Sequence, residues 1–296
     1  MSAVWLEQRE RGSLLATKAG VRLLLRVGHA FGRLLLYPAC AYFLASSRAA
    51  RAASRDYLGR VLGRPAGLRD VARHYLTFAK TLHDRVYFLA GRHDQYDVEY
   101  HGAEEVREIL AQGKGCLLIG AHLGSFEVLR VIGSLERKLP VNVLLYPGNA
   151  ANTDAVAAEL CPELKSRVIP LGRPDTLLRV HGCLERGEIV GMLGDRALKS
   201  DKTVRCDFLG APANFPQGPL LLASILKAPV VLFFGVYLGG RRYAIHFERF
   251  AGEIQLDRRS RSAQLQPHVA RYAARLEHYC RRAPYNWFNF YDFWRS

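Results

Sequence analysis

The sequence lacks any pairing pattern among its cysteines. The six cysteines are scattered singly, without a Cys-x-x-Cys pair and without the Cys/His spacing that zinc sites use. The sequence therefore predicts neither a disulfide framework nor a metal site. The cysteines are expected to be buried or free thiols of a protein in a reducing compartment. They are Cys40, Cys116, Cys161, Cys183, Cys206 and Cys280.

Long uninterrupted hydrophobic runs are also missing. A helix that spans a bilayer needs about 20 consecutive apolar residues, and arginines interrupt every candidate stretch in the first 50 residues. A signal peptide is not expected either, because Glu7 and Glu10 precede the would-be apolar segment. The chain of 296 residues is nevertheless 49% hydrophobic and contains no repeat or low-complexity tract, so a large folded domain is expected.

The sequence lacks the motifs of two functional classes. A serine hydrolase of the nucleophile-elbow type requires Gly-x-Ser-x-Gly, and Gly124-Ser125-Phe126 has no second glycine in place. The net charge of +15 would suit a nucleic-acid-binding protein, but the basic residues lie among Leu, Val and Phe without a recognisable binding module. No nucleic-acid partner is predicted.

The positive charge is concentrated near the N-terminus. Residues 1–92 contain 16 Lys and Arg against 5 Asp and Glu, a net +11, and the remaining 204 residues contain 26 against 22, a net +4. This first third is expected to face an anionic partner.

Within this third, basic residues recur at helical spacing. On a helix they would form one narrow stripe, with Leu24 and Phe31 on the opposite side, until Pro38 interrupts the pattern. One interpretation is an amphipathic helix that lies in a membrane interface, with its basic residues near anionic headgroups. The alternative is a core-packing helix with a solvated basic face. The residues predicted to dock on the membrane are Lys18, Arg22, Arg26 and Arg33, and His29 belongs to the same stripe.

The pattern changes at residue 93. Residues 1–92 are predicted to be a basic helical membrane-docking region, and residues 93–296 an α/β domain in which short apolar strands alternate with helices. The expected fold class is α/β, with a mixed, largely parallel sheet that carries helices on both faces, preceded by the amphipathic helical region. The strands are expected at 97–100, 116–121, 141–145, 167–170, 189–193, 230–236 and 243–250. A long loop is expected between the strand at 189–193 and a helix at 220–226.

The most informative stretch is 115–127. A strand-length apolar run ends at Ala121, a glycine-flanked turn carries His122, and a helix-like segment follows with Glu127 in its first turn. Histidine exchanges protons near neutral pH, and a neighbouring carboxylate fixes its tautomer. We therefore predict that His122 is a general base and that Glu127 orients it.

Other polar loops follow strands of the same predicted sheet. Asp195 and Arg196 end the strand at 189–193, and ligands bind beyond the carboxyl ends of strands in open α/β sheets, so this end and that of His122 are expected to converge. A surface ion pair between Asp195 and Arg196 is the alternative. Arg173 precedes a helix and is a candidate anion or oxyanion clamp. The run Phe215, Gln217 and Gly218 introduces another helix whose N–H groups could meet a ligand oxygen.

In sequence order these loops resemble the blocks of the lysophospholipid acyltransferase superfamily. The branch that looks most similar is the late acyltransferases of lipid A biosynthesis, which share a basic N-terminal helix, a Gly-Arg segment like Gly172-Arg173 and an aromatic C-terminal region like Tyr285-Asn286-Trp287-Phe288. The resemblance extends from about residue 10 to the end. The sequence is also similar to acyltransferases of aryl polyene pathways, through its Trp5 to Ser13 start and its Phe-Pro-Gln-Gly-Pro run.

The resemblance implies a reaction and its partners. The histidine of the first block would remove a proton from a hydroxyl of a lipid or glycolipid acceptor, which attacks a fatty acyl thioester, with no cofactor. Acyl carrier protein, or another acyl thioester donor, would supply the chain. Arg196 stands where lipid A enzymes tend to have a second acidic residue, and Gln217 and Pro219 depart from the Phe-Pro-Glu-Gly-Thr block of members with phosphate acceptors. These departures leave an acceptor outside lipid A open. A monotopic or peripheral enzyme on the cytoplasmic face of a bacterial inner membrane is expected, with a non-catalytic membrane adaptor as the competing class.

Overall fold

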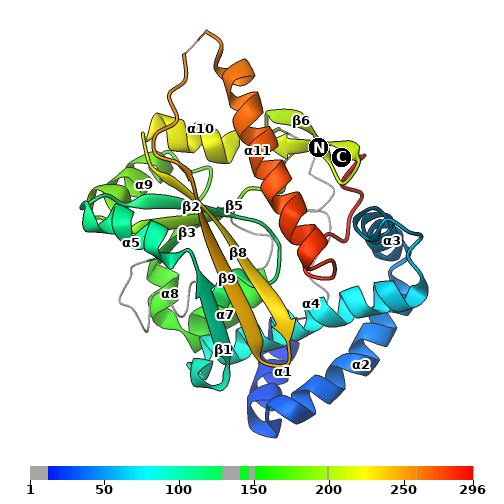
Figure 1. The fold of residues 1–296 in the computed structure, drawn as a ribbon. Helices are drawn as coiled ribbons and strands as arrows, with labels where there is room; N and C mark the ends of the chain where they lie inside the picture. Colours follow the sequence, from blue (N-terminus) through cyan, green and yellow to red (C-terminus); the bar gives the residue numbers. More distant parts are fainter. Residues whose placement is uncertain (1–12, 129–140, 147–150, 199, 258, 296) are drawn as a thin grey trace.

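The computed structural model describes residues 13–128, 141–146, 151–198, 200–257 and 259–295 (Figure 1). The N-terminal region is helical, as predicted, in its described part. Its helices do not break where expected: Gly28, with φ 85° and ψ 161°, ends the first helix, and Pro38 lies inside the second. Glycine adopts such backbone angles without steric cost. The four helices are α1(Leu14–Val27), α2(His29–Ser46), α3(Arg48–Leu62) and α4(Leu68–Leu89).

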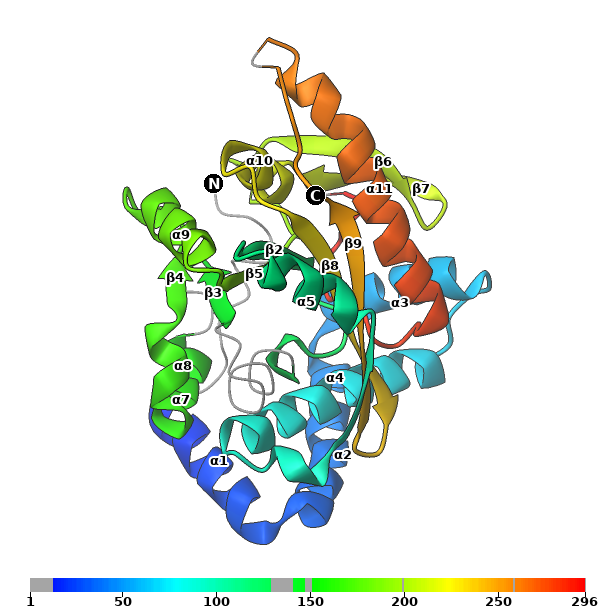
Figure 2. The same ribbon diagram turned by 60° about the vertical axis from the view of Figure 1, so that its left-hand side comes forward.

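A seven-stranded sheet forms the centre of the molecule, in the order β1-β9-β8-β2-β5-β3-β4. All neighbouring pairs are parallel except β8 and β9, which confirms the mixed, largely parallel sheet. Helices cover both faces (Figures 1 and 2). The elements after α4 are η1(His93–Gln95), β1(Asp97–His101), α5(Ala103–Ala111), β2(Cys116–Gly120), β3(Val141–Leu145), α7(Ala151–Leu160), α8(Pro162–Ser166), β4(Val168–Pro170), α9(Thr176–Glu185), β5(Ile189–Leu193), β6(Thr203–Phe208), β7(Ala211–Pro216), α10(Gly218–Ile225), β8(Val230–Gly239), β9(Arg242–Ala251) and α11(Arg261–Arg282).

The expected long loop before α10 contains an antiparallel hairpin, β6 and β7, so that part of the prediction was wrong. Its first strand alternates exposed and buried residues, and buried Val204, Cys206 and Phe208 pack into the core on the side of α11. The helix predicted at 126–135 begins at Phe126, and its part after residue 128 lies outside the described residues.

The two faces of β2 belong to two separate hydrophobic clusters. Leu117 and Ile119 pack with α11 and α9 on one face, and Cys116 and Leu118 pack with α5 and β9 on the other. All five residues of β2 are buried, which is why the strand has an uninterrupted apolar sequence. The residue that follows it is thereby fixed at the carboxyl edge of the sheet.

Cations of the predicted basic stripe form ion pairs with other parts of the folded chain. Lys18 and Arg22 pair with Glu159 of α7 at 2.8 and 3.1 Å, and Arg33 pairs with buried Asp84 of α4 at 2.7 Å. Among the described side chains, Arg26 alone of the four has no recorded ion-pair partner. Carboxylates of the folded chain thus pair with three of the four cations, and docking of this stripe on a membrane stays a prediction.

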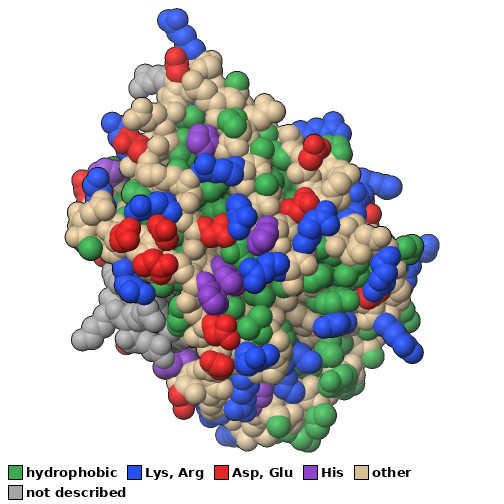
Figure 3. All heavy atoms as spheres, in the orientation of Figure 1, with side chains coloured by type: hydrophobic (Ala, Val, Ile, Leu, Met, Phe, Trp, Pro, Cys, Tyr) green, Lys and Arg blue, Asp and Glu red, His purple; other side chains and the backbone are tan. Residues whose placement is uncertain are grey.

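Apolar side chains of α1 and α2 point outward instead. Figure 3 shows hydrophobic side chains gathered over α2, with Lys and Arg beside them. In the described part of the chain, no helix is both long and apolar enough to cross a bilayer. We call this surface the apolar face; its exposed large side chains are Leu15, Leu23, Phe31, Leu34, Leu35, Tyr37, Tyr42 and Phe43.

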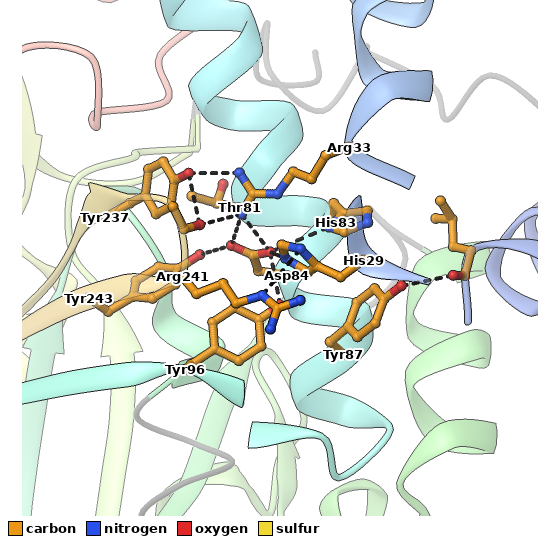
Figure 4. A network of polar contacts seen from close by, with 12 residues as sticks. His29, Arg33, Thr81, His83, Asp84, Tyr87, Tyr96, Tyr237, Arg241 and Tyr243 are labelled. Atoms are coloured by element: carbon orange, nitrogen blue, oxygen red, sulfur yellow. Dashed lines mark hydrogen bonds and ion pairs between the residues drawn. The ribbon is translucent and has the colours of Figure 1, made fainter. Parts of the chain in front are cut away.

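A buried carboxylate connects α2 and α4 to the sheet. Asp84 accepts hydrogen bonds from Arg33 at 2.7 Å and from the hydroxyls of Tyr243 and Tyr96 at 2.7 and 2.9 Å (Figure 4). His29 Nε2 lies 3.1 Å from the same carboxylate. The pKa of Asp84 stays well below its usual value despite burial, because these donors and the Arg33 charge stabilise the anion. The network thereby fixes α2 relative to α4 and the sheet.

Candidate active site

His122 stands just beyond the carboxyl end of β2. Ala121 is buried, and Leu123 and Gly124 form isolated bridges to Trp287 and to Gly235 of β8. Gly124 has φ 64°, and a Cβ there would overlap the carbonyl of Gly235, so glycine is required for this approach. These contacts hold the turn that presents the imidazole.

The end of β5 delivers the partner of His122. Because β2 and β5 are adjacent and parallel, their ends lie side by side, and the Gly194 N–H donates to the Gly120 carbonyl at 2.9 Å. Oδ1 of Asp195 lies 2.8 Å from Nδ1 of His122, and Oδ2 accepts the His122 backbone N–H at 3.1 Å. The predicted convergence of the two strand ends is confirmed. Asp195 is buried, which rules out the surface ion pair with Arg196.

This geometry assigns the tautomer of His122. A carboxylate can only accept, so Nδ1 carries the hydrogen and Nε2 presents its lone pair. The His122 side chain is 31% exposed, and among the described residues no partner is recorded for Nε2. An imidazole held in this way can remove a proton from a bound hydroxyl.

Residues that follow α11 complete the site. Trp287 Nε1 donates to Oδ2 of Asp195 at 2.9 Å, and the Phe288 N–H donates to the His122 carbonyl at 2.8 Å. Arg196 donates to the Phe288 carbonyl at 2.8 Å, and the Asn286 carbonyl accepts the Gly124 N–H. We call residues 286–288 the C-terminal clasp. The sequence analysis gave the clasp no role in the site. A buried tryptophan N–H nevertheless needs a hydrogen-bond acceptor, and Asp195 was already a candidate site residue.

The charges of the site keep the base neutral. Burial and the positive charge of Arg196 lower the pKa of His122, and Asp195 opposes this effect. Burial raises the pKa of Asp195, but His122, Arg196 and Trp287 outweigh it and lower the value to about 2. At neutral pH the pair is therefore a neutral imidazole beside an ionised carboxylate.

Glu127 does not have the position predicted for it. Its Oε1 lies 2.9 Å from the Arg85 guanidinium of α4, whereas Asp195 occupies Nδ1 of His122. The orienting carboxylate is thus Asp195. The physical reason is topological: the turn directs the imidazole toward the neighbouring parallel strand, and Glu127 begins a helix that faces α4.

Arg173 lies far along the sheet from His122. It follows β4, which is three strands away from β2, so about 14 Å separate the two strands at 4.7–4.9 Å per strand. Its side chain is 66% exposed and approaches Asp175 at 3.8 Å. At this position Arg173 cannot act as an anion or oxyanion clamp beside His122.

The predicted loop before α10 is part of the framework. Phe215 is fully buried against Phe208, and the Gln217 amide donates to Thr203 O and to Ser262 Oγ. Gly218 opens α10. Phe215 therefore cannot contact a substrate, and Gln217 serves to join the hairpin to α11.

One group of described residues has the composition of a metal site. Potential ligand atoms of His29, His83 and Asp84 lie within 4.8 Å of one another. However, Arg33 contacts both oxygens of Asp84, and two tyrosine hydroxyls share them. A divalent cation would have to displace the guanidinium, so we interpret the group as the structural network described above.

The fold places a histidine paired with a carboxylate at the carboxyl edge of a parallel sheet, an arrangement that suits general-base chemistry. The family of bacterial lipid A biosynthesis acyltransferases matches residues 55–296, and the chain belongs to this family. It is therefore an acyltransferase. No curated protein matches the sequence. The family match begins inside α3, so it includes α4 together with the sheet and starts well before the predicted boundary at residue 93.

Proposed function

We propose that the protein transfers a fatty acyl chain from a thioester, carried by acyl carrier protein, to a hydroxyl of a lipid or glycolipid acceptor. The observation that carries this proposal is the 2.8 Å contact between Asp195 and His122 Nδ1, which leaves Nε2 as a base at a partly exposed site. No nucleophilic serine or cysteine is required. The six cysteines are buried, or half-buried in the case of Cys40.

In the proposed reaction Nε2 of His122 takes the proton of the acceptor hydroxyl as its oxygen attacks the thioester carbonyl. The carbon–sulfur bond of the tetrahedral intermediate then breaks, and the imidazolium returns the proton to the leaving thiolate. Asp195 stabilises the imidazolium between these steps and keeps the ring in one tautomer. Each cycle yields one ester and one thiol, and His122 ends neutral.

Negative charge develops on the thioester oxygen, so a donor must meet it. Arg196 is the better candidate than Arg173, because its charge is close enough to lower the pKa of His122. The Gly124 and Ser125 N–H groups are already bonded to Asn286 O and Gly235 O. The first N–H groups of the helix that begins at Phe126 remain the backbone candidates.

The catalytic test is acyl transfer by purified protein. Acyl carrier protein thioesters are supplied with a panel of acceptors that includes lipid A precursors and aryl polyene-type lipids, and products are identified by mass spectrometry. His122→Ala is expected to lower turnover by at least about 10²-fold, and Asp195→Asn by a similar factor. Wild-type protein that neither transfers nor hydrolyses the chain, together with His122→Ala that preserves cellular function, would favour a membrane adaptor.

We further propose that the apolar face, rather than the basic stripe, attaches the enzyme to the membrane. The face carries exposed Phe31, Leu34 and Tyr42, and exposed Arg48 and Arg55 of α3 follow it in the chain, where they can meet anionic headgroups. This arrangement suits a monotopic enzyme on the cytoplasmic side of a bacterial inner membrane.

Cosedimentation with vesicles of phosphatidylethanolamine and phosphatidylglycerol tests the attachment. Leu34→Glu, at a side chain 62% exposed, is expected to release most of the bound protein. Leu178→Glu on α9, 76% exposed, is the matched control and should bind like wild type. Equal binding by all three proteins would contradict the attachment through α2.

A further inference from the structure

A cavity of about 310 Å³ opens between the carboxyl end of β8, the end of α11 and the side of α4. Its lining includes two arginines and one histidine but no carboxylate. Figure 3 shows Lys, Arg and His side chains over the middle of this side of the molecule, with Asp and Glu side chains among them. The volume is at the lower end of the range of small-molecule sites. The residues that carry the argument are Arg73, Val236, Leu238, His246, Arg282 and Asn286.

The two arginines keep their charge free for a ligand. Within the described residues neither Arg73 nor Arg282 forms an ion pair; Arg73 lies over the Tyr285 ring at 4.3 Å, and both side chains belong to exposed residues. Stacking on an aromatic ring orients a guanidinium without neutralising it.

The carboxylates around the cavity are already neutralised by other arginines. Asp70, which accepts the Tyr285 hydroxyl, pairs with Arg64 at 2.8 Å. Glu248, which accepts the Tyr279 hydroxyl, pairs with Arg275 at 2.6 Å. The charge that remains at the cavity is therefore positive.

The behaviour of His246 agrees with a positive local potential. Burial together with the nearby His101 and Arg282 lowers its pKa to about 4. At neutral pH His246 is uncharged, so its ring can offer a hydrogen bond while the two arginines supply the charge. Val236 and Leu238 add an apolar wall.

We propose that this cavity is a binding site for a phosphate ester, with Arg73 and Arg282 as the groups that hold the phosphate. Guanidinium groups bind phosphate oxygens through paired, charge-assisted hydrogen bonds. The apolar wall accepts the first carbons of the esterified group. The site is distinct from His122, although Asn286 belongs both to its lining and to the C-terminal clasp.

Binding of three probes to the full chain tests the proposal: inorganic phosphate, glycerol 3-phosphate and dihexanoyl phosphatidic acid. Calorimetry at constant ionic strength is expected to show binding by wild type and about 10-fold weaker binding by Arg73→Gln and by Arg282→Gln. Tighter binding of phosphatidic acid than of glycerol 3-phosphate would assign the site to a lipid headgroup, and the reverse order to a soluble ester.

Matched controls separate a site from general attraction to a basic protein. Arg69→Gln removes an exposed charge one turn earlier on α4, and Arg281→Gln removes a charge from the same last turn of α11, where cations also offset the helix dipole. Both controls should bind the probes like wild type. His122→Ala should also bind them, which keeps this test independent of catalysis. Equal losses in control and cavity variants, or no wild-type binding at millimolar probe, would overturn the proposal.

Discussion

The indole N–H of Trp287 and Oδ2 of Asp195 lie 2.9 Å apart, and the same oxygen accepts the backbone N–H of His122. The carboxylate that orients His122 is thus itself held by the C-terminal clasp. Trp287 is thereby a positioning residue for the proposed catalytic pair.

Trp287→Phe tests this relationship, because it retains an aromatic ring and removes the donor. We expect turnover to fall about 10-fold with a much smaller change in KM, since one hydrogen bond to a charged group contributes about 1.5–3 kcal/mol. Trp294→Phe is the control: it removes a tryptophan that donates to the Phe208 carbonyl at 3.2 Å, outside the site. Equal loss of activity in both variants would show a general packing effect.

The pH dependence of catalysis should reflect His122. Only the neutral imidazole is a base, and its pKa is lowered by burial and by Arg196, so kcat/KM should fall on acidification with a midpoint below about 6.5. Arg196→Gln removes a repulsive charge, raises the pKa of His122 and should move this midpoint to higher pH. Pre-steady-state or kcat/KM profiles measure the shift. An unchanged or lowered midpoint would contradict the placement of the Arg196 charge.

Glu127 and Arg85 provide a double-mutant cycle. If Glu127 acts through Arg85, Glu127→Gln and Arg85→Gln should each destabilise the protein, and the double variant should be less destabilised than the sum of the two. An interaction free energy of about 1–3 kcal/mol is expected for groups in contact. Chemical denaturation measures it. Strictly additive values would favour a separate partner for Glu127, including the role beside His122 that its spacing first indicated.

Asp84→Asn should be strongly destabilising. Breaking a buried ion pair costs about 3–5 kcal/mol of unfolding free energy, because Arg33 would remain buried without its partner. Asp56→Asn breaks an exposed ion pair with Arg60 and should change the free energy of unfolding by about 0–1 kcal/mol. Urea titration compares the two variants.

The pKa of Asp84 adds a pH signature to the same residue. The pKa of Asp84 is lower in the folded state than in the unfolded state, so ionised Asp84 stabilises the fold fully above the unfolded-state pKa of about 3.9. This stabilisation is lost as the pH falls below that value. The difference in stability between wild type and Asp84→Asn should therefore shrink on acidification from pH 5 toward lower values. A difference that grows on acidification would contradict the lowered pKa.

Much of the sheet could be predicted, because buried parallel strands such as β2 and β5 are short apolar runs between helices. The same reasoning brought His122 and Asp195 together, since ends of parallel strands share one edge. The hairpin of β6 and β7 was missed because Pro212 and Pro216 interrupt its second strand.

Periodicity identified the basic stripe but not what it faces. The spacing of Lys18, Arg22 and Arg33 defines one side of a helix, whereas Glu159 and Asp84, which attract that side, are distant in sequence. Trp287 was equally out of reach, because its partner Asp195 is 92 residues away and no local pattern links them.

The C-terminal clasp also determines when the site can form during synthesis. His122 and Asp195 are separated by 73 residues, and the clasp follows both of them and α11 in the chain, so it leaves the ribosome after them. Contacts of such long sequence separation form late in folding. The nascent chain is therefore expected to lack this arrangement until residues 286–288 have been synthesised.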